Sequence, residues 1–326
     1  MRRRDVLLAV LAGSSVAAAR SLAQSRDLPV IGFISVGPVT SPAYLTSVEA
    51  FREGLASQGY EQDRNVAFLP ARPDGPQLSA EELVRRPVAL IVSNDLQAAR
   101  TAMETNPAVP IVFATRFDPV RAGLIRSLNR PGGNATGVTS FGSSVDAKRL
   151  ELLRDMLPAA RRVAVLRNPT GPDADGHLGN LETAARDFGM ELVLASASTE
   201  AELEPAFATL AAGKADVFLL AEDNVFTPRY AQIVPLAARL GLPTVYPGPG
   251  RAYVRAGGLI GYGPDGLETA RTMGVYAGRI LAGEKPADLP VAQPRKFDLV
   301  INLKTARALG LRMPDTLLAR ATAVIE

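Results

Sequence analysis

The sequence contains no cysteine and a single histidine, His177, among its 326 residues. The absence of cysteine excludes disulfides, thiolate metal sites and a cysteine nucleophile. One histidine leaves no His-rich metal set, and no Ser/His/Asp triad can be assembled without it. It stands beside Asp173 and Asp175 at a predicted helix start, so we expect a solvent-exposed position. We expect no metal and no cofactor, and only a carboxylate pair is left as a catalytic alternative.

Phosphate-binding motifs are also absent. The glycine clusters at residues 132–133 and 257–263 do not form the strand-turn-helix G-x-G-x-x-G of dinucleotide sites, and no Walker lysine loop occurs. Nucleotide binding through a glycine-rich loop is therefore not predicted.

An apolar run covers residues 6–19, which is too short for the roughly 20 residues that span a bilayer. Three arginines precede it, and Ser21 and Ala23 supply the small residues that a signal peptidase reads. We predict an export signal at residues 1–23, cleaved before Gln24, and a periplasmic mature protein. Residues 3–7 resemble a twin-arginine signal, and a Sec signal is the alternative.

The formal net charge of +3 belongs to that signal, since residues 1–23 hold four arginines and one acidic residue. Without them the basic and acidic residues are equal in number. Nucleic-acid binding needs a clustered cationic face, so we expect no nucleic-acid partner. The 47% hydrophobic content is ordinary for a globular protein with a full core, and the length allows two domains.

From residue 28 onward, short buried strands alternate with amphipathic helices, which predicts an α/β fold with parallel sheets covered on both faces. The predicted strands are residues 30–35, 65–69, 88–93, 110–115, 162–167, 191–195, 216–221, 243–246 and 297–301. The predicted helices include residues 44–59, 96–103, 146–157, 178–188, 228–240, 265–281 and 303–309.

The two halves of the chain are similar to each other. The strand at 88–93 ends in Asn94-Asp95, and the strand at 217–221 is followed by Asp223-Asn224. Extended glycine-containing segments at residues 131–141 and 257–263 interrupt the alternation. We interpret these segments, with a third near residue 297, as crossings between two lobes.

Four segments in order, residues 118–124 (DPVRAGL), 130–138 (RPGGNATGV), 258–263 and 300–310 (VINLKTARALG), closely resemble ABC transporter substrate-binding proteins of the tryptophan/tyrosine-binding-like family. The resemblance runs from about residue 28 to the C-terminus. It implies a type I periplasmic-binding fold, with two Rossmann-like lobes joined by three crossing segments. It also implies a small-molecule ligand, in some members an aromatic amino acid, that is delivered to an ABC permease in the inner membrane.

The lobes are expected at residues 28–137 with about 262–292, and at residues 138–261 with about 293–326. We expect a monomer. Ligands of open α/β sheets bind beyond the carboxyl ends of the strands, which selects the candidate ligand-binding residues. They are Thr40, Tyr44, Ser93, Asn94, Thr115, Asp118, Thr139, Phe141, Asn168, Asp223, Tyr246 and Tyr262.

Asp118 and Asp223 are the candidate partners for a ligand ammonium group. Asp118 alternatively caps the turn before Pro119, and Asp223 alternatively caps a helix or faces solvent. The hydroxyls of Ser93, Thr115 and Thr139 are candidates for an anionic group or, alternatively, satisfy backbone groups at strand ends.

The aromatic candidates for stacking on a planar ligand are Tyr44, Phe117, Phe141, Phe226, Tyr246 and Tyr262, with core packing as the alternative for each. Arg116 is either a carboxylate clamp or a surface residue. The predicted function is that of an exported solute-binding protein of an ABC importer. A ligand sensor of the same fold and an exported enzyme with a carboxylate pair in the cleft are the alternatives.

Overall fold

The computed structural model of the chain describes residues 28–34, 42–71, 80–140, 142–171, 174–248 and 251–326. The predicted export signal and the candidate residues Thr40 and Phe141 lie outside these ranges. Among the described residues, no helix has the length and apolar character needed to cross a bilayer.

The first lobe is built on a five-stranded sheet with the order β2-β1-β3-β4-β5 and only parallel pairs. Its strands are β1 (Val30–Ile34), β2 (Ala67–Ala71), β3 (Leu90–Ser93), β4 (Ile111–Thr115) and β5 (Ala135–Thr139). Its helices are α2 (Pro42–Ala56), α3 (Ala80–Val84), α4 (Leu96–Thr105) and α10 (Gly266–Leu281). The predicted α/β class is confirmed.

Both faces of this sheet are buried. Phe51 of α2 and Met273 of α10 pack with Ile31 and Val92 on one face. Side chains of α3 and α4 pack with Ile91, Ile111 and Phe113 on the opposite face. Because successive strand side chains point to opposite faces, a strand buried on both sides must be apolar throughout.

Helices α2 and α10 approach so closely that glycine is required at two contacts. A Cβ at Gly54 would lie 1.9 Å from the carbonyl oxygen of Arg271, and one at Gly274 would lie 2.0 Å from that of Phe51. Helix α10 therefore belongs to the first lobe, although it follows a strand of the second sheet.

The second lobe contains a seven-stranded sheet with the order β12-β11-β10-β9-β8-β6-β7, in which only the β10–β11 pair is antiparallel. Its strands are β6 (Arg162–Arg167), β7 (Glu191–Ser196), β8 (Val217–Leu220), β9 (Thr244–Pro247), β10 (Ile260–Pro264), β11 (Phe297–Asn302) and β12 (Ala323–Ile325).

Helices cover both faces of this second sheet as well. One core includes residues of α5 (Gly142–Met156), α6 (Ala174–Asp187) and α12 (Asp315–Arg320), and the other includes residues of α7 (Leu203–Ala212), α8 (Tyr230–Arg239) and α9 (Arg251–Arg255). Helix α11 (Leu303–Ala308) follows β11, and the described residues also form three 3₁₀ turns. They are η1 (Glu200–Glu202), η2 (Thr227–Arg229) and η3 (Pro286–Asp288).

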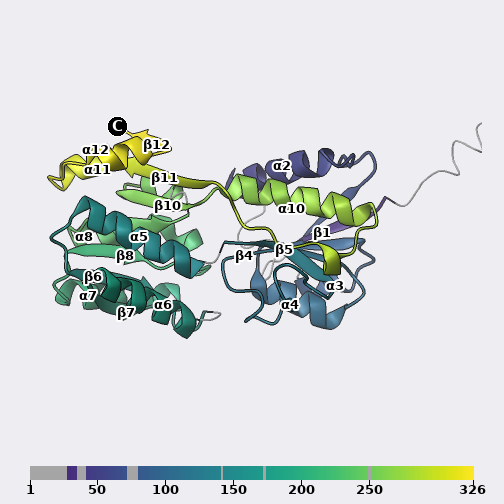
Figure 1. The fold of residues 1–326 in the computed structure, drawn as a ribbon, viewed down its shortest axis with the longest axis horizontal. Helices are drawn as coiled ribbons and strands as arrows, with labels where there is room; N and C mark the ends of the chain where they lie inside the picture. Colours follow the sequence, from purple (N-terminus) through teal and green to yellow (C-terminus); the bar gives the residue numbers. More distant parts are fainter. Residues whose placement is uncertain (1–27, 35–41, 72–79, 141, 172–173, 249–250) are drawn as a thin grey trace, which may run out of the picture.

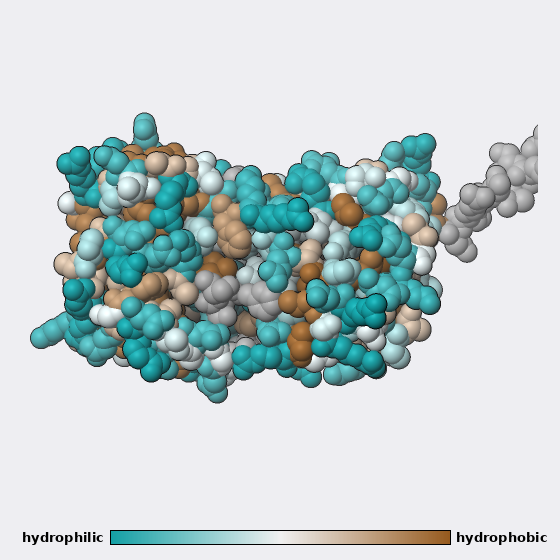
Figure 2. Space-filling model, viewed as in Figure 1, coloured by the Kyte–Doolittle hydropathy of each residue, from teal (hydrophilic) through white to brown (hydrophobic). Residues whose placement is uncertain are grey.

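The chain passes between the two sheets three times, after β5, between β10 and α10, and between η3 and β11 (Figure 1). The second and third passages are joined where the Asp265 amide donates to the Lys296 carbonyl at 3.0 Å. The third also pairs with β5, since the Ala292 amide donates to the Gly137 carbonyl at 2.9 Å. The space-filling view narrows between the lobes, and the face of them that it shows is mostly hydrophilic (Figure 2).

Candidate functional site

Residues that follow strands of the two sheets meet between the lobes. Arg116, which follows β4, lies against Glu222, which follows β8. Parallel strands place their carboxyl ends at one edge of a sheet, and both such edges face each other here. The predicted position of the site between the lobes therefore has a structural counterpart.

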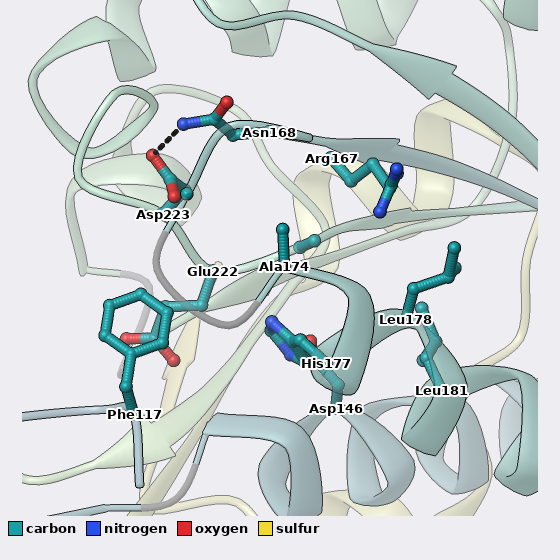
Figure 3. A pocket seen from close by; sticks show the side chains of 12 residues that line it. Phe117, Asp146, Arg167, Asn168, Ala174, His177, Leu178, Leu181, Glu222 and Asp223 are labelled. Atoms are coloured by element: carbon teal, nitrogen blue, oxygen red, sulfur yellow. Dashed lines mark hydrogen bonds and ion pairs between the residues drawn. The ribbon is translucent and has the colours of Figure 1, made fainter. Parts of the chain in front are cut away.

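A small pocket opens at this place, mainly on the second lobe (Figure 3). Phe117 is the first-lobe residue that lines it, and Asn168, Glu222 and Asp223 come from the ends of β6 and β8. The cavity measures about 20 Å³, little more than a single water molecule requires. The remaining lining residues are Asp146, Arg167, Gly171, Ala174, His177, Leu178, Leu181 and Ala221.

A buried ionic cluster lies beneath the pocket. Arg149 of α5 has no exposed side-chain surface, and its guanidinium donates to Asp146, to Glu222 Oε2 at 3.1 Å and to the Tyr262 carbonyl at 2.9 Å. Burial opposes ionisation of both carboxyl groups, but the Arg149 charge, together with Arg116 beside Glu222, holds their pKa values below the usual range. The cluster thus remains charged at neutral pH.

His177 joins this cluster. Its Nε2 atom lies 2.7 Å from Asp146 Oδ2, and 16% of its side chain is exposed. Burial lowers the pKa of His177, but the neighbouring Asp146 carboxylate outweighs burial and raises it above the ordinary value. The expectation of a solvent-exposed histidine is wrong, because α6 begins at Ala174 and turns His177 toward α5.

Arg116 connects the cluster to the first lobe. Its Nε atom lies 3.3 Å from Glu222 Oε1, and Nη1 donates to Asn224 Oδ1 at 2.9 Å. Asn224 Nδ2 in turn donates to Asp95 Oδ2 at 3.4 Å. Asp95 is itself fixed as the N-cap of α4, where it accepts a hydrogen bond from the Ala98 amide at 2.7 Å.

Asp223 and Arg167 supply opposite charges to the pocket. Asp223 Oδ1 accepts from Asn168 Nδ2 at 3.1 Å and from the Val225 amide at 2.8 Å, while no partner for Oδ2 occurs among the described residues. Arg167 Nη1 is buried, and it too has no hydrogen-bond partner among the residues that the structure describes. A buried guanidinium nitrogen without an acceptor is costly, so it favours a bound anionic group.

Thr115 and Thr139 position the loop that carries Phe117. Thr115 Oγ1 accepts from the Phe117 amide at 3.1 Å, and Thr139 Oγ1 donates to the Phe117 carbonyl at 3.0 Å. In this conformation both hydroxyls form hydrogen bonds with backbone groups, which is the alternative to binding an anionic group.

The other polar candidates on the first lobe also have local partners. Asp118 Oδ1 accepts from the Val120 amide at 2.8 Å, as expected for an aspartate that caps a turn. Ser93 is fully buried, and its hydroxyl donates to the Asp95 carbonyl at 3.0 Å. Asn94 is exposed, and its backbone N–H donates to the Ile34 carbonyl at 3.3 Å. None of these three side chains lines the pocket.

The tyrosine candidates pack against other rings. Tyr246 is 1% exposed and stacks on Tyr253 with ring centroids 4.9 Å apart, which corrects its placement at the cleft. Tyr262 stacks on Phe297 at 5.8 Å, and Tyr44 contacts Phe33 edge-on at 5.9 Å. Phe226 is fully buried. Core packing, the alternative for each ring, describes these positions.

Several pocket residues are not among the candidates from the sequence. Arg167 directly precedes the candidate Asn168, and its place at the end of a predicted buried strand is the sequence signal that points to it. Asp146 and Arg149 are one helical turn apart on α5, a spacing that occurs on many solvent-exposed helices. Nothing in their sequence neighbourhood indicates that they are buried.

Comparison with known proteins relates most of the chain to one family. Residues 34–325 match the family model described as ABC transporter substrate binding protein. The chain is 28% identical over 278 residues to the "Tyrosine-binding protein" of Clostridioides difficile (strain R20291), covering 84% of this chain and 79% of the relative.

Solved structures share the same fold. A conserved domain protein from Vibrio cholerae has a TM-score of 0.81 and 27% identity, covering 91% of this chain and 99% of that one. An ABC domain from Streptococcus pneumonia in complex with L-Trp has a TM-score of 0.80 and 24% identity, with 91% and 100% covered. The expected type I periplasmic-binding fold with two lobes and three crossings is confirmed.

Proposed function

Because the chain belongs to the ABC transporter substrate-binding protein family, we propose that it binds an amino acid with an apolar or aromatic side chain in the periplasm. Solute binding for an ABC importer follows from the family, and a permease is the partner that this role implies. The class of ligand, export to the periplasm and the monomeric state are parts of the proposal.

The proposed ligand class is inferred from Arg167 Nη1, which is buried and has no hydrogen-bond partner among the described residues. A zwitterion needs a cation for its carboxylate and an anion for its ammonium group, and Arg167 with Asp223 supplies both in one pocket (Figure 3). Phe117, Leu178 and Leu181 supply apolar surface for a side chain. The printed names of two similar proteins, one tyrosine-binding and one in complex with L-Trp, support the same class.

Calorimetry with matched ligands tests this proposal. L-Tyrosine carries both charges, tyramine lacks the carboxylate, and N-acetyltyrosine lacks the ammonium group. We expect tyrosine to bind, with a loss of roughly tenfold to a hundredfold for each analogue, the usual value of a hydrogen bond to a charged group. Equal affinity for tyrosine and tyramine would contradict the role of Arg167.

Two variants assign the charges to residues. Arg167→Gln should weaken tyrosine binding and leave tyramine binding nearly unchanged. Asp223→Asn should likewise weaken tyrosine binding and leave N-acetyltyrosine binding nearly unchanged. Arg186→Gln, an exposed arginine of α6, is the control for loss of one positive charge. If the control weakens binding as much as Arg167→Gln, the effect is one of net charge and the assignment fails.

The catalytic alternative makes a different prediction. The family binds its substrates without converting them, so a ligand incubated with the protein should be recovered unchanged by mass spectrometry. Turnover would favour a cleft enzyme.

N-terminal sequencing of the exported protein tests cleavage before Gln24, and sedimentation tests the monomeric state.

A further inference from the structure

An arginine of the first lobe reaches across the cleft and is held by two residues of the second lobe. Arg116 contacts Glu222 at 3.3 Å and Asn224 at 2.9 Å, and 23% of its side chain is exposed. The pairing partners are 106 and 108 positions away in the sequence and belong to the other sheet.

The acceptor of Arg116 is rigidly placed. Glu222 is held from below by Arg149, which has no exposed surface and is fixed in turn by Asp146 and the Tyr262 carbonyl. A preorganised, partly desolvated carboxylate binds an arginine more strongly than an exposed one does, because less side-chain entropy is lost and solvent screens less.

The second contact continues into the first lobe. Asn224 accepts from Arg116 and donates to Asp95, the N-cap of α4, so it is held between two first-lobe residues. Opening of the cleft would break all three contacts at once. These contacts therefore stabilise only the closed arrangement of the lobes.

We propose that Arg116 is an interlobe latch, a positioning residue that biases the lobes toward closure before any solute binds. In this latch Glu222 is held in place by the buried Arg149, and the Arg116 side chain forms or breaks the contact as the lobes close or open. It goes beyond the solute-binding role, because it acts on the unliganded protein. A solute that enters must compete with or open this contact.

Distance measurement on the ligand-free protein tests the latch. The native sequence has no cysteine, so Gln97→Cys on α4 and Ala231→Cys on α8, both exposed, provide two unique sites for spin labels. We expect a short interlobe distance in the otherwise unaltered protein. Arg116→Ala should shift the distribution to longer distances, with a roughly tenfold lower ratio of closed to open molecules.

Two further variants separate the latch from a general charge effect. Asn224→Ala removes one partner without changing the charge and should shift the distribution partway. Arg130→Ala, an exposed arginine of the same loop, should leave it unchanged. Arg116→Ala leaves Glu222 paired with Arg149, so the fold is kept, and circular dichroism checks this.

Identical distance distributions for the labelled parent and Arg116→Ala would overturn the proposal. An equal shift with Arg130→Ala would overturn it too, because the effect would then be one of net charge. Since no ligand is added, either result leaves the proposed amino-acid ligand to be judged by calorimetry alone.

Discussion

Arg149 is fully buried, and a buried guanidinium is tolerated only when acceptors surround it. Two carboxylates and a carbonyl do so here. The pair of charges from Asp146 and Arg149 would add little stability by itself, since desolvation offsets attraction in a buried ion pair. The structural effect of the Asp146–Arg149 pair is to hold Glu222 in place at the floor of the cleft.

The only histidine of the chain provides a pH test of this cluster. The pKa of His177 is raised above its ordinary value of 6.5 by Asp146, despite burial. A raised pKa means that protonation stabilises the fold. This contribution is complete below pH 6.5 and is lost as the pH rises through the raised pKa. Replacing the histidine should therefore cost more stability in mildly acidic than in alkaline solution.

Urea unfolding of the parent and of His177→Gln at about pH 6 and about pH 9 measures this difference. The pKa values of Asp146 and Glu222 are lowered by Arg149 and Arg116, so neither carboxylate titrates in this interval. A difference in unfolding free energy that is the same at both pH values would contradict the ion pair between His177 and Asp146.

At the scale of elements, the contact between α2 and α10 explains two glycines inside helices. Glycine costs about 1 kcal/mol relative to alanine in a helix interior, so alanine should stabilise unless its Cβ meets other atoms. At Gly54 and Gly274 it would meet backbone oxygens of the partner helix at about 2 Å. Backbone atoms cannot move aside without separating the helices.

We expect Gly54→Ala and Gly274→Ala each to destabilise the protein by about 1 to 3 kcal/mol, the usual cost of overpacking. Gly179→Ala in α6 is the matched control, because a Cβ there would meet no atom within 4 Å beyond its chain neighbours and the backbone of its own helix. This control should stabilise by up to about 1 kcal/mol. Chemical denaturation compares the three variants, and a stabilised Gly274→Ala protein would refute the close approach.

The strands and long helices were predictable because their apolar positions recur at a fixed spacing. The strand expected at residues 162–167 is β6 (Arg162–Arg167), with its bounds as predicted. Short elements were missed, among them α9 (Arg251–Arg255) and β12 (Ala323–Ile325). Five or fewer residues give too little periodicity to distinguish a helix or strand from a loop.

At the scale of the whole molecule, the sequence predicted a site between the lobes, where the candidate pocket is found, but not which side chains meet there. The strand-end rule led to Asn168 and Asp223, which do line the pocket. It also led to Tyr246, because the rule gives the end of a strand and not the face toward which a side chain points. The pairing of Arg116 with Glu222 depends on the arrangement of two separate sheets, which no local pattern encodes.

The lobes are discontinuous in sequence, and this leads to a prediction about fragments. Residues 28–140 contain all five strands of the first sheet but not α10. Without α10, the apolar surface of Phe51 and the neighbouring strand residues that pack with Met273 would face solvent. We therefore expect residues 28–140 alone to lack cooperative unfolding.

Joining residues 28–140 to residues 265–292 through a flexible Gly/Ser linker restores α10 with its N-cap Asp265 and the segment that pairs with β5. This fusion should unfold cooperatively in thermal and urea denaturation. The fragment without α10 is the matched control. A fragment 28–140 that folds as well as the fusion would mean that the first lobe does not depend on the returning helix, and the proposed lobe boundary near residue 292 would have to be moved.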